Sequence, residues 1–140
     1  MMQRTKEALD IGIVAGNIDA SLNFYQEVLG LAFVQKLPTW TGTGTMYRLR
    51  FDNSAFKLLE VPREPPKGPV GLVAQLGFRY VTSLVKNLSD ICQILRDKAV
   101  PFEIPENESR PGVHVAMVRD PDGNIIELVE LDPRVKSDFL

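Results

Sequence analysis

Apolar and polar positions in the first half of the chain follow the periods of a strand, a helix and three further strands. Residues 9–15 form a short apolar run with β-branched side chains, which predicts a strand. Asn17 and Asp19 are helix-capping residue types, and they precede apolar positions at helical spacing that end at Gly30. Three more strands are predicted at residues 31–36, 46–51 and 55–61. The pattern predicts a βαβββ module over residues 8–62.

The second half repeats this pattern in the same order. Asn87 lies 70 positions after Asn17, and at the same shift the run Leu58–Val61 falls on Leu128–Leu131. A fixed internal period of this kind indicates a duplicated unit. The predicted elements are a strand at 79–85, a helix after Ser89, and strands near 101–104, 113–118 and 124–131. We therefore expect a second βαβββ module over 78–132, joined to the first by a proline-rich linker at 63–77 within one domain spanning 1–140. Glu103–Glu108 is expected to be an acidic loop.

Composition excludes several classes of protein. The chain has 140 residues, one cysteine and a formal net charge of −2. A single cysteine cannot form an internal disulfide or a cysteine-rich zinc site. The near-neutral charge without a Lys/Arg run argues against a nucleic-acid partner. The first residues carry no apolar secretory region, and no apolar run approaches the ~20 residues that span a bilayer. We expect a cytoplasmic protein with neither nucleic acid nor membrane as its partner.

One helix covers only one face of a four-stranded sheet. The other apolar face of each module then needs a partner, which a second module or a second chain could supply. Curved sheets that pair in this way leave a cleft between them, and a cleft of that kind suits a small organic molecule.

Three segments of the chain carry a family resemblance. Asp120–Leu128 reads Asp-Pro-Asp-Gly-Asn-Ile-Ile-Glu-Leu, in which Pro121 and Gly123 suit a tight turn before a returning strand. Together with Ile18–Tyr25 and Val28–Leu31, this segment resembles the glyoxalase / bleomycin-resistance / extradiol-dioxygenase superfamily, which has the vicinal oxygen chelate fold. The resemblance covers residues 8–132. It implies an α+β cup, a half-open barrel of two βαβββ modules, and a homodimer.

The resemblance also implies four positions at which enzymes of the superfamily usually hold a divalent metal through His and Glu. Carried over residue by residue, these positions are Asp10, Lys57, Tyr80 and Glu127. Strand parity directs Asp10, Lys57 and Glu127 away from their apolar neighbours. Only Glu127 is a usual ligand type. A tyrosine phenol must first lose a proton with a pKa near ~10, and a lysine ammonium has no acceptor at all. We therefore expect no metal and no cofactor.

Three functional hypotheses follow. The first is a metal-independent protein that binds or sequesters a small organic ligand, like the superfamily's antibiotic-resistance proteins. The second is a lyase, isomerase or dioxygenase-like enzyme, in which Glu127 or Asp10 acts as a base and Lys57 or Tyr80 stabilises an enolate. The third is a scaffold whose cup is closed by a salt bridge of Lys57 with its neighbouring carboxylates.

Four further residues are candidates for ligand contact. Trp40 lies in a Gly/Thr segment between two strands, where an aromatic side chain can cover an apolar ligand or pack on its own domain or a second subunit. His114 is the only histidine, and it would either contact a ligand or have a structural or exposed role. Arg48 and Arg50 share one face of a predicted strand, where they would meet either an anionic ligand or solvent.

Overall fold

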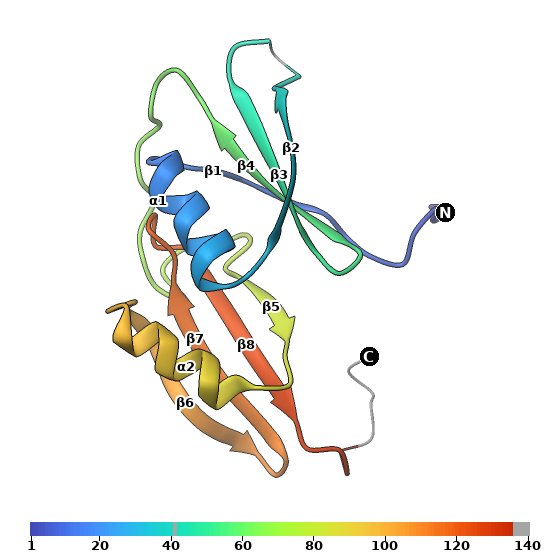
Figure 1. The fold of residues 1–140 in the computed structure, drawn as a ribbon, viewed down its shortest axis with the longest axis vertical. Coiled ribbons are helices and arrows are strands. Elements are labelled where there is room, and N and C mark those ends of the chain that lie inside the picture. Colours follow the sequence, from blue (N-terminus) through green and yellow to red (C-terminus); the bar gives the residue numbers. More distant parts are fainter. Residues whose placement is uncertain (41, 136–140) are drawn as a thin grey trace. The chain divides into compact units, whose positions relative to one another are not determined.

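The computed structural model describes residues 1–40 and 42–135, and it divides the chain into two compact units. The first unit is Met1–Lys67 and the second is Gly68–Leu140. Each unit contains one mixed four-stranded sheet and one helical segment (Figure 1). No helix in the described part of the chain is long and apolar enough to cross a membrane.

The first unit has the strand order β1-β4-β3-β2. Strand β1 pairs with β4 in parallel, whereas β4–β3 and β3–β2 are antiparallel pairs. The elements in chain order are β1 (Ile11–Val14), α1 (Ile18–Leu22), the π-helix η1 (Asn23–Val28), β2 (Ala32–Pro38), β3 (Thr45–Phe51) and β4 (Ser54–Glu60).

Both ends of the helical segment follow the sequence. The Asn17 side chain accepts a hydrogen bond from the backbone N–H of Ala20 at 3.0 Å, which satisfies one free donor of the first turn. Gly30 ends the segment with a φ of +78°, a left-handed conformation that glycine adopts without steric cost. Tyr25 packs its ring against Phe56 of β4, with 4.5 Å between the ring centroids. The helix therefore covers the face of the first sheet that carries Phe56.

The second unit repeats this arrangement with the strand order β5-β8-β7-β6. Leu88, Cys92 and Leu95 of the helix α2 (Leu88–Asp97) are buried. Glu130 of β8 accepts a hydrogen bond from the N–H of Leu88 at 2.7 Å, so a strand residue caps this helix. The elements are β5 (Tyr80–Leu84), α2 (Leu88–Asp97), β6 (Phe102–Arg110), β7 (Val113–Arg119) and β8 (Ile125–Leu131).

The two βαβββ modules and the α+β class predicted from the sequence are confirmed. One local prediction is wrong: Glu103–Glu108 is not a loop but the middle of β6. Pro105 lies within this segment, and proline removes one donor of the strand ladder. The strand is at the edge of its sheet, and its register shifts on either side of this proline, which is where proline is tolerated in a sheet.

Candidate functional site

Each sheet has one face toward its helix and one open face, and the candidate residues lie on the open faces. In the first unit, Phe56 and Leu58 point toward the helix, so Lys57 between them points the other way. Residues paired across strands share a face. The open face of the first sheet thus carries two rows from β1 through β4 and β3 to β2: Gly12, Lys57, Arg48 and Gln35; Val14, Leu59, Met46 and Leu37. A third row consists of Ala55, Arg50 and Ala32, and Asp10, the residue before β1, joins it through a hydrogen bond from the Ala55 N–H.

Lys57 and Asp10 form an ion pair on this open face. The Lys57 Nζ lies 3.7 Å from Asp10 Oδ2, and the two side chains are 31% and 23% exposed. Asp10 Oδ1 also accepts a hydrogen bond from the N–H of Ala55 at 2.9 Å, and Lys6 donates to the same oxygen. The carboxylate is therefore held by two ammonium groups and one backbone donor.

These contacts lower the pKa of Asp10 to about 2, from an ordinary value of 3.8. The hydrogen bond from Lys6 contributes most, followed by the Ala55 N–H, and the charge of Lys57 adds to both. Each of these contacts favours the charged form, whereas burial of the carboxylate opposes it. Asp10 is ionised throughout the neutral range, and its weak basicity makes it a poor proton acceptor in catalysis.

Two like charges lie opposite each other in the middle row. Arg48 of β3 is paired directly with Lys57 of β4, and Arg50 is the next residue of β3 on the same face. Directly opposed like charges destabilise an antiparallel pair. Within the described residues, neither Arg48 nor Arg50 has an ion-pair partner. The open face of the first sheet is therefore locally cationic.

The open face of the second sheet has a different chemistry. Thr82 is paired with Glu127 across β5 and β8, and the Thr82 hydroxyl donates a hydrogen bond to the Glu127 carboxylate. Met117 of β7 lies on the other side of Glu127 and is buried. Tyr80 begins β5 two residues before Thr82, on the same face, and is 52% exposed. The carboxylate has one hydroxyl donor and an apolar neighbour.

The structure separates His114 from this group. His114 is paired with Glu130 of β8 and Glu108 of β6, at odd spacing from Met117 along β7. It therefore lies on the opposite face of the second sheet from Glu127.

Trp40 lies in the loop that joins β2 to β3, beyond the pair formed by Leu37 and Met46. Its side chain is 80% exposed. Thr41, the next residue, lies outside the described residues.

The structure thus brings Asp10 together with Lys57 in one unit, and places Tyr80 with Glu127 on one face of the other. Sequence reasoning missed two contacts, Lys6 on Asp10 and Thr82 on Glu127. Thr82 could have been found from its position two residues after Tyr80 in a predicted strand. Lys6 precedes the predicted strand and carried no signal.

The side chains at the four positions carried over from the superfamily do not fit the ligand set of a divalent metal. Lys57 is a cation paired with Asp10 and offers no acceptor atom, and Tyr80 offers a phenol, a residue type that must lose its proton before it can coordinate a metal. Among residues 1–40 and 42–135, no group of three or more His, Cys, Asp or Glu side chains is arranged to hold a metal ion. The residues present therefore disagree with the metal site that the resemblance implied.

Comparison with known proteins establishes the family. A model of the glyoxalase/bleomycin resistance protein/dioxygenase superfamily matches residues 8–128, so the chain belongs to this superfamily. Proteins of this superfamily bind small molecules. A relative from Synechocystis sp., described as a probable lactoylglutathione lyase, is 28% identical over 123 residues, which cover 84% of this chain and 90% of the relative.

Solved structures show the same fold. A glyoxalase family protein from Enterococcus faecalis has a TM-score of 0.72 and 23% identity, covering 90% of this chain and 98% of its own. A glyoxalase/bleomycin resistance protein/dioxygenase from Alicyclobacillus acidocaldarius has a TM-score of 0.65 and 16% identity, covering 95% and 98%. The TM-scores establish a shared fold. Sequence identities this low do not identify a ligand, which must be argued from the side chains.

Proposed function

We propose that this protein binds a small organic molecule without a metal ion, in the manner of the sequestering members of its superfamily. The observation that carries the proposal is the ion pair between Lys57 and Asp10, at two of the positions where metal-dependent relatives are expected to place ligands. A divalent cation ~4 Å from an ammonium group is repelled by several kcal/mol at an effective dielectric constant near 20. The ion pair leaves that position without a free carboxylate.

Two measurements on the purified full chain test this proposal. Metal analysis after exposure to Zn²⁺, Ni²⁺, Mn²⁺ and Fe²⁺ should find no stoichiometric ion, and Glu127→Gln should not change that result. A thermal-shift screen of aromatic compounds, antibiotics and keto acids should find ligands whose effect persists in chelator. A ligand at 100 times its dissociation constant adds roughly 2.7 kcal/mol of stability.

Stoichiometric metal uptake that depends on Glu127 would contradict the proposal. Absence of any hit would instead favour a scaffold whose face is closed by the Lys57–Asp10 pair.

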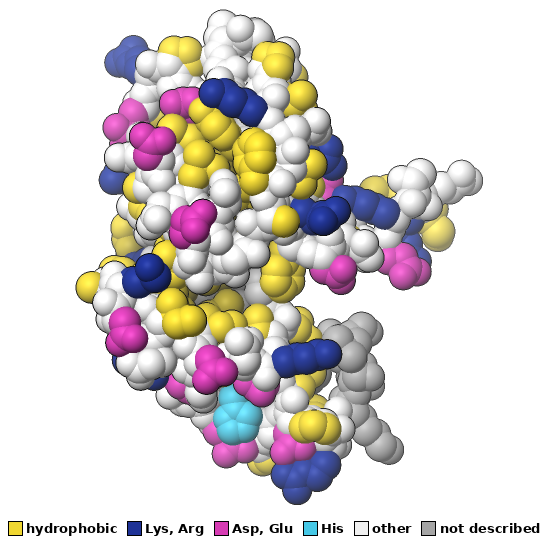
Figure 2. All heavy atoms as spheres, in the orientation of Figure 1, with side chains coloured by type: hydrophobic (Ala, Val, Ile, Leu, Met, Phe, Trp, Pro, Cys, Tyr) yellow, Lys and Arg dark blue, Asp and Glu magenta, His cyan; other side chains and the backbone are white. Residues whose placement is uncertain are grey.

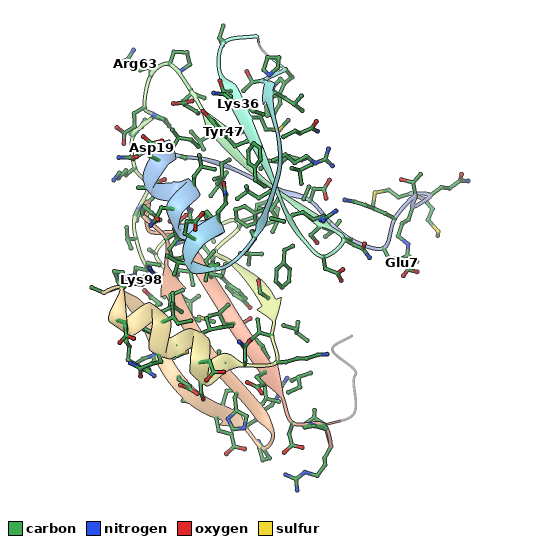
Figure 3. All side chains as sticks on the ribbon, viewed as in Figure 1. Glu7, Asp19, Lys36, Tyr47, Arg63 and Lys98 are labelled. Carbon is green, nitrogen blue, oxygen red and sulfur yellow. The ribbon has the colours of Figure 1, made fainter. Side chains whose placement is uncertain are left out.

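A lyase or isomerase is the second candidate, and the 28% identical relative described as a probable lactoylglutathione lyase favours it. In this structure Glu127 would be the better base, because the pKa of Asp10 is lowered to about 2. A metal-free enzyme should turn over hemithioacetals or related carbonyl compounds in the presence of chelator. Glu127→Gln should abolish that turnover, whereas the control Lys98→Gln, an exposed position after α2 that Figure 3 labels, should not.

The homodimer and the cytoplasmic location stay predictions that come from the superfamily resemblance and the composition. A role in antibiotic resistance is a finer form of the first candidate. Sedimentation of the purified chain tests the dimer, and survival of expressing cells on a drug panel tests resistance.

A further inference from the structure

We infer that the open face of the first sheet recognises a small molecule with an anionic head group joined to an apolar body. This inference rests on the proposed binding function and specifies the chemical class of the ligand. It is carried by two adjacent rows of side chains, one cationic and one apolar, whose order is set by the strand register.

The charge of the face is not balanced from within. Lys57, Arg48 and Arg50 contribute three positive charges, whereas Asp10 contributes one negative charge. That carboxylate is already shared by Lys6, Lys57 and the Ala55 N–H. The two arginines therefore retain free donors on the described face, and a guest anion would relieve the repulsion between Arg48 and Lys57.

The side of the molecule drawn in Figure 2 does not show this concentration of one sign. Lys and Arg side chains are interspersed with Asp and Glu on that side. On the helix-covered face of the first sheet, Lys36 lies over the Tyr47 ring at 5.0 Å, and both are labelled in Figure 3. The Tyr47 hydroxyl in turn donates to Glu60 at 3.0 Å. The cation of that face already has a partner.

Guanidinium and ammonium groups together favour a carboxylate, phosphate or phosphonate. Arginine presents a planar fork of N–H donors that matches two oxygens of such a group, and lysine adds a compact charge. Arg48 is half-buried, so a hydrogen bond to it is less screened by water than one at a fully exposed arginine.

The apolar row lies one step along the strands from the cations. Val14 lies two residues after Gly12, and Leu59 lies two residues after Lys57. Met46 lies two residues before Arg48 on the antiparallel strand β3. Positions two apart on a strand are separated by ~6.8 Å. That spacing fits a ligand with one ring and a short link to its anion. The loop carrying Trp40 continues beyond this row.

The experiment is an NMR titration of the ¹⁵N-labelled full chain at low salt with five probes. Phenylacetate and phenylphosphonate carry the anion on a ring, phenylacetamide and phenethylamine replace it with a neutral or cationic group, and inorganic phosphate lacks the ring. We expect at least one ring anion to bind about tenfold or more tightly than phenylacetamide, through amides of β3 and β4. The better of the two ring anions identifies the head group.

Variants assign the selectivity to the face. Arg48→Gln should reduce anion affinity about tenfold and leave phenylacetamide binding unchanged, and Arg50→Gln provides a second test should the first variant fold poorly. Arg63→Gln is the matched control, because this substitution removes the same charge at an exposed arginine in the segment after β4 (Figure 3). Added salt should weaken the binding of the anionic probes and leave phenylacetamide binding unchanged.

Several outcomes would overturn the inference. If neither phenylacetate nor phenylphosphonate binds more tightly than phenylacetamide, or if the anion preference survives both arginine variants, the cations have no role in recognition. Inorganic phosphate binding as tightly as phenylphosphonate would remove the role of the apolar row. If none of the probes shifts this face while the thermal screen finds other ligands, the inference fails and the proposed binding function stands.

Discussion

Replacing Asp10 with Asn tests the ion pair on which the proposed function depends. The amide keeps the size of the side chain and can still accept from the Ala55 N–H, so the change removes mainly the charge. Two limits bracket the expected effect. A pair of charges at 4 Å is worth about 4 kcal/mol at an effective dielectric constant of 20, whereas exposed pairs measure 0.2–1 kcal/mol.

The exposure of the side chains decides between these limits. At 23% for Asp10 and 31% for Lys57, both groups retain contact with water, and Lys6 is 41% exposed. We therefore expect Asp10→Asn to lower the free energy of unfolding by about 1 kcal/mol at pH 7, well below the value for dry charges. Urea denaturation of Asp10→Asn, Lys57→Met and the double variant forms a cycle that isolates the coupling of this pair.

The pH dependence supplies an independent check. The pKa of Asp10 is lowered in the folded protein to about 2, from 3.8. A lowered folded pKa stabilises the protein above the unfolded value, and this contribution is lost as pH falls from about 4 to 2. The difference in stability between the parent and Asp10→Asn should therefore shrink over that range. A coupling energy of zero together with parallel pH profiles would refute the ion pair as a stabilising contact.

Three other substitutions have definite expected outcomes. Arg48→Gln should raise the free energy of unfolding by about 0.5 kcal/mol, because it removes a like charge opposite Lys57, and a loss of stability in urea would contradict this. Ser21→Ala should raise it by about 1 kcal/mol, since the buried Ser21 hydroxyl has no hydrogen-bond partner among the described residues, and an unchanged denaturation midpoint would count against that assignment. Asp120→Ala should lower it by about 2–3 kcal/mol, because the buried Asp120 carboxylate accepts three hydrogen bonds within its turn, and a melting temperature equal to the parent's would show that they contribute nothing.

The sequence was sufficient for the features that arise from local periodicity and from duplication. Asn17 and Gly30 mark the two ends of the helical segment. Both ends could be predicted because helix capping and a left-handed backbone are properties of single residue types. The shared shift of 70 positions predicted the second module from the first. Parity along β4 was enough to direct Lys57 away from Phe56 and Leu58.

Features that depend on neighbouring strands could not be read in this way. The register of β3 against β4 places Arg48 opposite Lys57, and register is set by the hairpin and the buried pattern of both strands together. Pairing with β7 makes Glu103–Glu108 a strand despite Pro105. The π-helical turn η1 depends on the Leu29 N–H reaching the Phe24 carbonyl, and no residue type in that stretch specifies this hydrogen bond.

The charge of the open face gives the two proposals a common physical basis. A divalent metal requires acceptors that are free to coordinate, but the Asp10 carboxylate is held by Lys6 and Lys57. The same lysine lies beside Arg48, so the proposed exclusion of a metal cation and the proposed preference for an anion rest on one set of charges. Local arrangements that cost stability in natural proteins concentrate at functional sites, and the opposed cations are such an arrangement. If Arg48→Gln stabilises the fold and weakens anion binding together, the repulsion is retained for recognition; stabilisation without a change in binding would assign it no such role.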